Sequence, residues 1–407
     1  MNSLLRTALI AAIALGGAVS AGAQTLPTLP SGPVTLFDGH LTLGGDVSAS
    51  IAPADTGFFN YTDYDHSALR LFRADLAVSL TLSPHFAVLG ELRDENIDTL
   101  RPYALYLRIR PWVDRAIDIQ VGRVPPTFGT FARRAYATDN PLIGYPLAYQ
   151  YLTPLRADAL PWNADELLSM RARGWLSSFS IGNTAPDNGV PLVTAFRWDT
   201  GVQLHAATDL VDGTVSVTTG TVSNPRWTDD NTAPQVAGHL SLRPIAGLVI
   251  GASAARGPFV SSTASRGAVG DGYDKSFTQT ALGADFEYSR DYYLVRAETI
   301  WSEWRLPEIG APVIDEPLRA SSTYVEGRYK VHPRLYVAAR ADHLGFSDIT
   351  GSAGRQSWDA PVTRVELGGG YSLQRNLLLK IACQHDARAG GRVTAATLTS
   401  AQLVYWF

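Results

Sequence analysis

The chain ends in Ala395–Phe407, which reads A-A-T-L-T-S-A-Q-L-V-Y-W-F. Successive residues of a β-strand point to opposite faces. One face of this stretch becomes apolar and then aromatic toward the chain end, and carries Thr397, Thr399, Ala401, Leu403, Tyr405 and Phe407. Four bulky apolar residues at a chain end are rare in soluble proteins, because free ends are usually solvated. We therefore expect this end to be buried in protein or in lipid.

The same stretch resembles the last strand of bacterial outer-membrane β-barrels, which typically ends in Phe behind alternating apolar positions. The resemblance implies that the assembly machinery of the outer membrane reads Tyr405 and Phe407, and that the C-terminus is periplasmic. The edge strand of an ordinary β-sandwich is the alternative. The remainder of the chain has to decide between the two.

Segments of about ten residues with strand periodicity recur from Leu41 onward. In the first of them Leu43 and Val47 alternate with Asp46 and Ser48. About sixteen such segments are clear, and the even number suits a single-chain bacterial barrel. They cover residues 41–51, 68–82, 86–94, 102–111, 116–122, 192–208, 214–222, 235–243, 247–256, 277–288, 292–304, 321–331, 335–346, 362–373, 377–387 and 395–407. A further weakly alternating stretch, 166–182, would raise the number to eighteen if it formed a hairpin.

The connections between these segments alternate in length. Tight turns such as 83–85 and 332–334 are followed by long polar segments such as 53–66 and 257–276. Outer-membrane barrels have short turns at the periplasmic rim and long loops at the external rim. The pattern favours an all-β, transmembrane, antiparallel up-and-down barrel over residues 41–407, with both termini periplasmic.

The first residues and the composition agree with export to the outer membrane. Residues 1–23 combine a basic start, a short apolar run and a small-x-small site before Gln24, which predicts a signal peptide. The Pro-rich segment 24–40 is expected to be a flexible periplasmic lead-in. Cys383 is the single cysteine, so no internal disulfide is possible. The net charge of −4 and the lack of basic blocks argue against nucleic-acid binding.

Charged residues of opposite sign recur two positions apart, and hence on one face of a predicted strand. Because outward faces are apolar, we expect these side chains to line the lumen, where they either orient solutes or neutralise one another. The predicted pore-lining residues are Arg73, Asp75, Glu91, Arg93, Arg108, Arg110, Asp118, Arg197, Asp199, Arg296, Glu298, Glu326, Arg328, Arg340, Asp342, Arg364 and Glu366.

A long insertion, residues 123–191, follows the fifth predicted strand and is rich in aromatic residues and proline. Such a segment should pack against something, and the inner wall of the barrel is available. It resembles the inward-folded constriction loop of trimeric porins, and its start, Gly-Arg-x-Pro-Pro-x-Phe-Gly, is similar to the phosphate-selective group, although that group's lysine cluster is missing. The resemblance implies a constriction and a homotrimer. The expected constriction residues are Arg133, Arg134, Tyr136, Asp139 and Tyr145. An external lid is the alternative.

No catalytic or metal-binding motif stands in a usable context, and no cofactor is expected. His385-Asp386 resembles half of an acid–base pair. Paired loop acids such as Asp229/Asp230 and Asp271/Asp274 are able to hold cations that bridge lipopolysaccharide, although solvated loops are the simpler interpretation. We predict an outer-membrane porin that passes small polar or ionic solutes and contacts membrane lipid and lipopolysaccharide. The alternatives are a barrel plugged by its insertion, with a structural or adhesive role, and an outer-membrane hydrolase.

Overall fold

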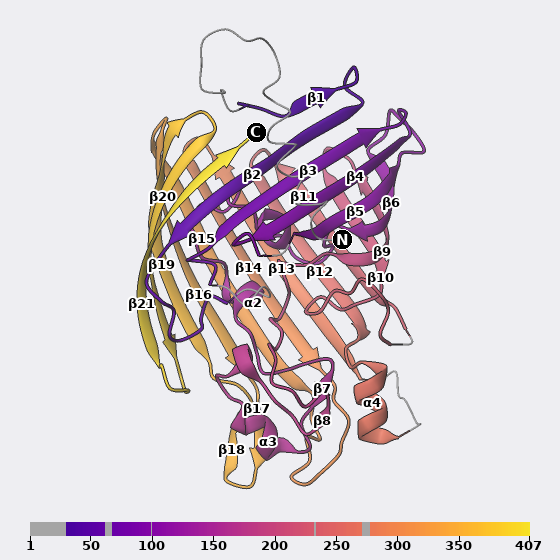
Figure 1. Ribbon diagram of the computed structural model, residues 1–407, viewed down its shortest axis with the longest axis vertical. Coiled ribbons are helices and arrows are strands. Elements are labelled where there is room, and N and C mark those ends of the chain that lie inside the picture. The colour runs from indigo at the N-terminus through magenta and orange to yellow at the C-terminus, as the bar shows by residue number, and fades with distance from the viewer. Residues whose placement is uncertain (1–29, 62–66, 99, 232, 271–276) are drawn as a thin grey trace.

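The structure is a computed structural model that describes residues 30–61, 67–98, 100–231, 233–270 and 277–407. Sixteen antiparallel strands form a closed barrel (Figure 1). Closure is direct, because the last strand pairs with the first barrel strand at Tyr405 and Val47. The barrel strands are β2 (Leu41–Ile51), β3 (Phe72–Thr81), β4 (Phe86–Glu95), β5 (Arg101–Ile109), β6 (Ile117–Val124), β9 (Asp199–Ala207), β10 (Val211–Thr218), β11 (Gln235–Ile245), β12 (Leu248–Pro258), β13 (Thr278–Arg290), β14 (Tyr293–Trp304), β15 (Leu318–His332), β16 (Leu335–Phe346), β19 (Val362–Gln374), β20 (Leu377–Arg388) and β21 (Ala395–Trp406).

The strands expose their apolar residues and bury their charged ones. On β19 the side chains of Arg364 and Glu366 are buried, whereas Val365 and Leu367 are 43% and 57% exposed. The same arrangement is found on β20, where Lys380 is buried and Ile381 is exposed. A soluble protein arranges these classes the other way round. A continuous exposed apolar belt is what a barrel that faces lipid requires.

Aromatic rings collect near the tight turns, as expected for a membrane interface. Tyr293 and Tyr329 lie on neighbouring strands with ring centroids 4.6 Å apart. Tyr405 and Phe407 lie 6.1 Å apart at the chain end. The backbone of Phe407 also exchanges two hydrogen bonds with Gly45, which joins the C-terminal residue to β2.

Three predicted strands differ from the observed ones by four residues or more at one end. Strand β3 begins at Phe72 rather than at 68, because Leu69 and Leu71 are buried, and Leu69 packs in one cluster with Ile143 of the insertion. Strand β9 begins at Asp199 rather than at 192, because Leu192–Trp198 is buried within the insertion. Strand β10 ends at Thr218 rather than at 222. A wall strand needs one face toward lipid, so segments buried on both faces are not part of the wall.

The alternative of eighteen strands is wrong. Residues 166–182 do not form a wall hairpin but contain most of α3 (Ala164–Ser169), the 3-10 turn η3 (Gly174–Leu176) and β8 (Ile181–Gly182). Strand β8 pairs only with β7 (Ala159–Leu160), outside the barrel sheet. The barrel therefore has the even number of strands that was predicted first.

Part of the expected lead-in, residues 34–36, forms a strand. The predicted signal peptide, 1–23, and residues 24–29 lie outside the described residues. Strand β1 (Val34–Leu36) pairs with Leu41–Leu43 of β2 and is the seventeenth strand of the sheet. The turn between them takes left-handed backbone at Phe37, Asp38 and Gly39. Strand β2 offers this free edge because β21 covers it only from Asp46 onward.

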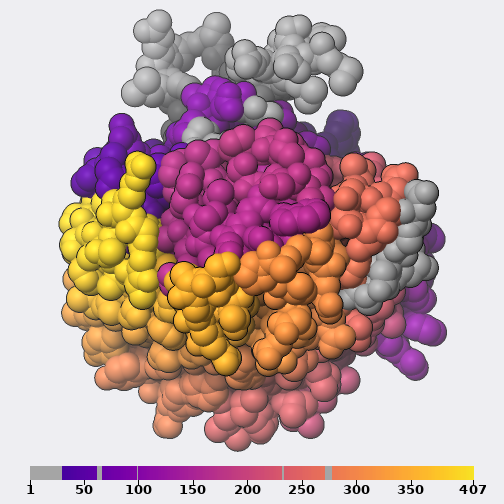
Figure 2. Space-filling view, turned by 90° about the horizontal axis from the view of Figure 1, so that it is seen from below, coloured from indigo at the N-terminus to yellow at the C-terminus, as the bar shows by residue number. Residues whose placement is uncertain are grey.

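The insertion occupies residues 125–198, between β6 and β9, and folds into the barrel. It contains the 3-10 turn η2 (Ala132–Arg134) and α2 (Leu147–Gln150) before α3. Figure 2 shows it filling the middle of the long-loop end, with the wall strands around it. Its apolar residues share one core with inward wall residues such as Ile300 and Val362. The expected inward fold therefore holds for its first half, and the alternative of an external lid does not apply there.

The long loops carry the remaining elements. These are α4 (Ser262–Val269), β17 (Asp348–Gly351) and β18 (Gly354–Ser357), and they lie at the same end as α3 (Figure 1). Helix α4 contacts β8, and α3 contacts β17. None of the helices in the described ranges has the length and hydropathy needed to cross a membrane.

Candidate functional site

The interior of the barrel is the candidate site, and its charged residues form cross-strand ion pairs. Arg364 pairs with Asp386 at 2.7 Å, and Arg340 pairs with Glu366 at 2.6 Å. On the other side of the β2–β21 pairing that closes the barrel, Arg73 pairs with Glu95 at 2.6 Å and Arg93 pairs with Asp75 at 2.5 Å. Neighbouring strands lie about 4.8 Å apart, so inward charges at one level reach each other. The predicted neutralising ladder is present on these strands.

The ladder also holds the insertion in place. Glu366 accepts hydrogen bonds from the backbone N–H groups of Ile143 and Gly144, at 3.2 and 2.9 Å. Asp342 accepts from the N–H of Leu147 at 2.5 Å, which lies at the start of α2. Tyr149 donates its hydroxyl to Glu298 at 2.7 Å. The acidic residues thus satisfy N–H groups of an aromatic segment that has no strand partners of its own.

The basic residues satisfy the carbonyl groups of the same segment. Lys380 donates to the backbone oxygens of Ala137 and Asn140, at 2.5 and 2.6 Å. Arg340 donates to the oxygen of Gly144 at 2.6 Å, and Arg364 donates to the oxygen of Tyr145 at 2.8 Å. We call Arg340, Glu366, Arg364 and Lys380 the clamp. Their side chains are fully buried, so on these strands the predicted pore wall is in contact with protein rather than with water.

A second part of the wall stays accessible beside the insertion. Arg134 pairs with Glu287 at 2.7 Å, and Arg296 pairs with the same carboxylate at 2.9 Å. Arg108 and Arg328 are half-buried, and Arg110 is exposed just beyond β5. We call Arg134, Glu287 and Arg296 the open cluster. Its side chains are 30%, 23% and 17% exposed, in contrast to the clamp.

Of the five expected constriction residues, Tyr145 is buried, whereas the other four keep part of their surface exposed. Arg133 and Asp139 are exposed, and Arg133 donates to the oxygen of Pro126 at 2.8 Å. Tyr136 is half-buried and donates its hydroxyl to Glu91 at 2.7 Å. Tyr145 lies in the core of the insertion, where it hydrogen-bonds Arg73 and donates to Ala135. Tyr145 therefore does not line a passage, because it is 5% exposed.

Arg197 and Asp199 do not form the same-face pair that was predicted. Asp199 begins β9 and accepts hydrogen bonds from the backbone N–H groups of Gly220 and Arg226, which fixes the loop after β10. Arg197 precedes the strand and lines a cavity of about 450 Å³ at the long-loop end, together with Arg101, Arg123 and Arg226. Asp118, also predicted, faces the lumen beside His205 at 3.3 Å.

The other sequence candidates have structural roles. His385 contacts Thr397 on the outer face, whereas Asp386 binds Arg364 inside, so the two do not form an acid–base pair. Asp230 pairs with Arg226 at 2.8 Å, and Asp271 and Asp274 lie outside the described residues. No cluster of three or more potential metal ligands occurs among the residues that the structure describes. The contacts of Tyr149 with Glu298, and of Gln150 with Arg364 of the clamp at 3.3 Å, were not predicted, because nothing in the sequence indicates which wall residue faces them.

Comparison with solved structures decides the class of barrel. OmpF of Salmonella typhi, in complex with daunomycin, superposes with a TM-score of 0.54 at 11% identity, over 92% of this chain and all of that one. OmpT of Vibrio cholerae gives 0.52 at 12% identity, over 92% and 100% of the chains. The anion-selective porin of Comamonas acidovorans gives 0.51 at 10% identity, over 90% and 99%. The chain has the fold of the outer-membrane porins. No protein-family model and no curated protein matches the sequence of this porin-like barrel.

Proposed function

We propose that this porin-like barrel is a passive diffusion channel of the outer membrane for small polar or ionic solutes. The observation that carries the proposal is the open cluster: charged side chains stay accessible in the interior of a closed barrel whose outer face is apolar. A sixteen-stranded barrel is wide enough to hold an aqueous channel. The insertion would narrow that channel, and solutes would pass along the open cluster.

The external mouth of the proposed passage is the cavity lined by Arg101, Arg123, Arg197 and Arg226. The indole of Trp227 lies over Arg123, with the guanidinium 4.0 Å from the ring centroid. The comparisons add nothing on selectivity, because the identities of 10–12% carry the fold alone. By resemblance to porins we also propose a homotrimer with periplasmic termini, and recognition of Tyr405 and Phe407 during assembly.

A barrel plugged by its insertion is the second candidate. The burial of the whole clamp favours it, since four charged wall residues contact the insertion and not water. No enzymatic role is proposed, because His385 and Asp386 point to opposite faces.

Single-channel recording in planar bilayers tests the two candidates. The porin proposal predicts open channels of low conductance in the wild-type protein. A closed baseline in the wild type, with large channels after deletion of residues 127–160, would support the plug and overturn the diffusion channel. Circular dichroism and the shift in gel mobility on heating serve as checks that the shortened protein still folds.

A further inference from the structure

Two histidines, His205 on β9 and His239 on β11, belong to the inner wall of the barrel. Their neighbours Leu204 and Leu240 are 49% and 52% exposed, and successive strand residues alternate between the two faces. Both histidines stand opposite Thr214 of β10, so they lie in one register row, about 10 Å apart. The other five histidines in the described ranges are exposed near turns or on the outer face.

Each of the two imidazoles faces carboxylates. In His205, Nδ1 lies 3.3 Å from Asp118 of β6, and Nε2 lies 3.4 Å from Asp212 of β10. In His239, Nε2 lies 3.1 Å from Asp285 of β13. A neutral imidazole has one N–H group and an imidazolium has two, so only protonated His205 can donate to both of its carboxylates at once. We call these five residues the histidine group.

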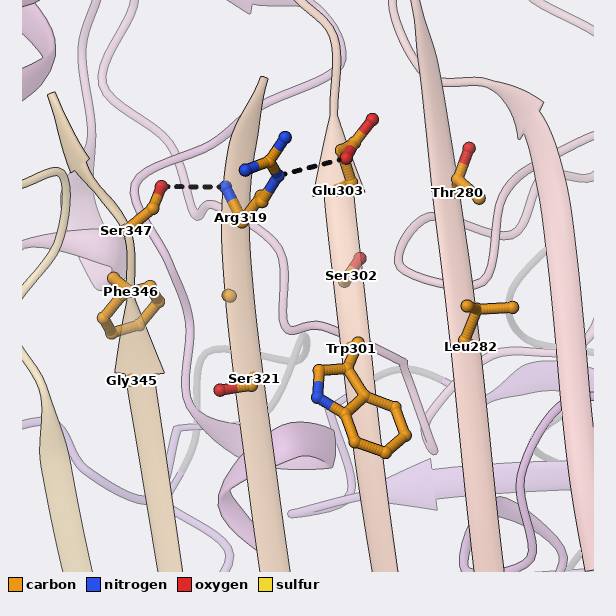
Figure 3. A pocket seen from close by; sticks show the side chains of 11 residues that line it. Thr280, Leu282, Trp301, Ser302, Glu303, Arg319, Ser321, Gly345, Phe346 and Ser347 are labelled. Carbon is orange, nitrogen blue, oxygen red and sulfur yellow. Dashed lines mark hydrogen bonds and ion pairs between the residues drawn. The ribbon is translucent and has the colours of Figure 1, made fainter. Parts of the chain in front are cut away.

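The histidine group meets the open cluster on β13. Leu282 and Trp301 project from the outer wall, as Figure 3 shows, and are 53% and 49% exposed. Asp285 lies three residues beyond Leu282 and therefore points to the inner side, where it is 8% exposed. Glu287 of the open cluster follows two residues later on the same face. The histidine group and the open cluster thus form one continuous polar stretch of the inner wall.

The insertion leaves part of the histidine group accessible. It covers the wall on the long-loop side of the group, where Thr127 donates to Ser216 at 2.8 Å and Gln203 donates to Thr127 at 2.6 Å. Gln203 and Ser216 are buried there. His205 and Asp212 lie closer to the tight turns and keep 25% and 20% of their side-chain surface exposed. The group therefore lines the lumen between the insertion and the tight-turn rim.

The other charges that face the group are fixed or lie on one more carboxylate. Arg243 of β11 donates to Asp212 at 3.1 Å, and Arg133 of the insertion interacts electrostatically with the same carboxylate. Asp285 stands opposite Glu298 of β14 in the register. Arginine keeps its charge at all relevant pH values, and ordinary carboxylates titrate below about pH 5. Histidine is the side chain that changes charge between about pH 5 and 8.

We propose that His205 and His239 determine the ion preference of the passage, and that their protonation moves this preference from cations toward anions. Neutral imidazoles leave the carboxylates of Asp118, Asp212 and Asp285 to attract cations. Each imidazolium cancels one of these negative charges. The inference rests on the proposed diffusion channel and names two specificity-determining residues for it.

The reversal potential in a salt gradient across planar bilayers, recorded at pH 8 and at pH 5.5, tests this inference. A unit charge about 5 Å from a permeating ion changes the local concentration of that ion about twofold at 0.1 M salt. One imidazolium therefore changes the ratio of cation to anion permeability about fourfold. We expect the ratio of the wild-type protein to fall by about fourfold or more from pH 8 to pH 5.5.

Two pairs of substitutions locate the titrating groups. His205→Gln with His239→Gln should remove most of the change with pH. The matched control is His343→Gln with His385→Gln, which replaces two exposed histidines that contact threonines on the outer face. It should keep the wild-type response. Heat-induced shifts in gel mobility show that each variant is folded.

A fixed charge at the same place gives a second, independent test. His205→Lys should lower the ratio of cation to anion permeability already at pH 8, an effect that a purely structural histidine would not produce. Open channels whose response to pH survives in the inner pair, or a ratio unchanged by His205→Lys, would overturn this inference and leave the channel standing. A wild-type protein that is silent at both pH values would overturn the diffusion channel, and this inference with it.

Discussion

The clamp and the open cluster are built from the same residue types on the inner face of one barrel, with Arg134 of the open cluster contributed by the insertion, yet their surroundings differ. Arg340 and Arg364 are fully buried, whereas Arg134 and Arg296 keep 30% and 17% of their side-chain surface exposed. The difference comes from where the insertion packs. Charge on an inner wall is therefore not by itself evidence of a pore, because the same ladder can serve as the binding surface of a folded segment.

Arg364→Met should have the largest effect, because it leaves Asp386 and the oxygen of Tyr145 without their buried partner. Breaking one side of a buried ion pair costs about 3–5 kcal/mol. Denaturant unfolding in detergent should show this loss, and the bilayer conductance should rise as the insertion loosens. Arg375→Met, in an exposed turn, is the control. Unchanged stability and conductance in Arg364→Met would mean that the clamp does not hold the insertion.

Val365→Arg tests the neighbouring position on the opposite face. Val365 lies six residues from Tyr371, about 15 Å along the axis, and hence near the middle of the apolar band. An arginine that faces lipid at that depth should cost about 2–4 kcal/mol in refolding into bilayers. In detergent micelles, which adapt more easily, the cost should be smaller. A stability equal to that of the wild type in bilayers would argue against a lipid-facing outer wall.

Reversal of the charge of Arg134 in the open cluster and of its neighbour Arg133 should change the ion selectivity of the channel with little loss of stability. Arg133→Glu with Arg134→Glu should shift the reversal potential toward cations if these residues line the passage. Arg290→Glu, on the outer face at the end of β13, should not. Glu287→Arg combined with Arg134→Glu restores the pair between these two positions in the opposite order, but it places a second cation beside Arg296, so stability should recover only in part. An unchanged reversal potential would place the passage elsewhere.

The smallest effect is expected outside the barrel, where the loop before β19 contacts the insertion. Asp359 accepts hydrogen bonds from the N–H groups of Ala172 and Ala360, and burial raises its pKa to about 7. Because this pKa lies above the unfolded value of about 3.9, protonation favours the folded state. The stability that this group contributes is fully present below about pH 4 and is lost as pH rises through about 7. Hydrogen exchange at Ala172 should follow that course, and Asp359→Asn should abolish it.

The wall could be predicted from the sequence because it depends on a local rule. Alternation with a period of two fixes which residues of β19 or β20 face lipid, whatever the partners are. The exposed apolar and buried charged residues there match the prediction, and so does the number of strands. Errors arose at 192–198 and 68–71, where alternation continues into segments whose apolar residues pack with the insertion and are not part of the wall.

The contents of the lumen could not be predicted in the same way. That Lys380 meets the oxygens of Ala137 and Asn140 depends on a contact between residues more than 200 positions apart. No periodicity encodes such a contact. Tyr145 illustrates the consequence. An aromatic residue suits a constriction and a packed core equally well, and the hydroxyl of Tyr145 is hydrogen-bonded inside the insertion. The sequence indicated that the segment packs inward and did not indicate which of its faces remains wet.

Cysteine accessibility compares the two regions in one experiment. The outward-facing Cys383 is first replaced by serine, and single cysteines are then placed at Arg134 and at Arg364. During bilayer recording a charged, water-soluble thiol reagent should reduce the conductance of the first variant within the assay time and leave the second unchanged. Equal modification of both positions, or modification of Arg364→Cys alone, would contradict a passage that runs beside a clamped insertion.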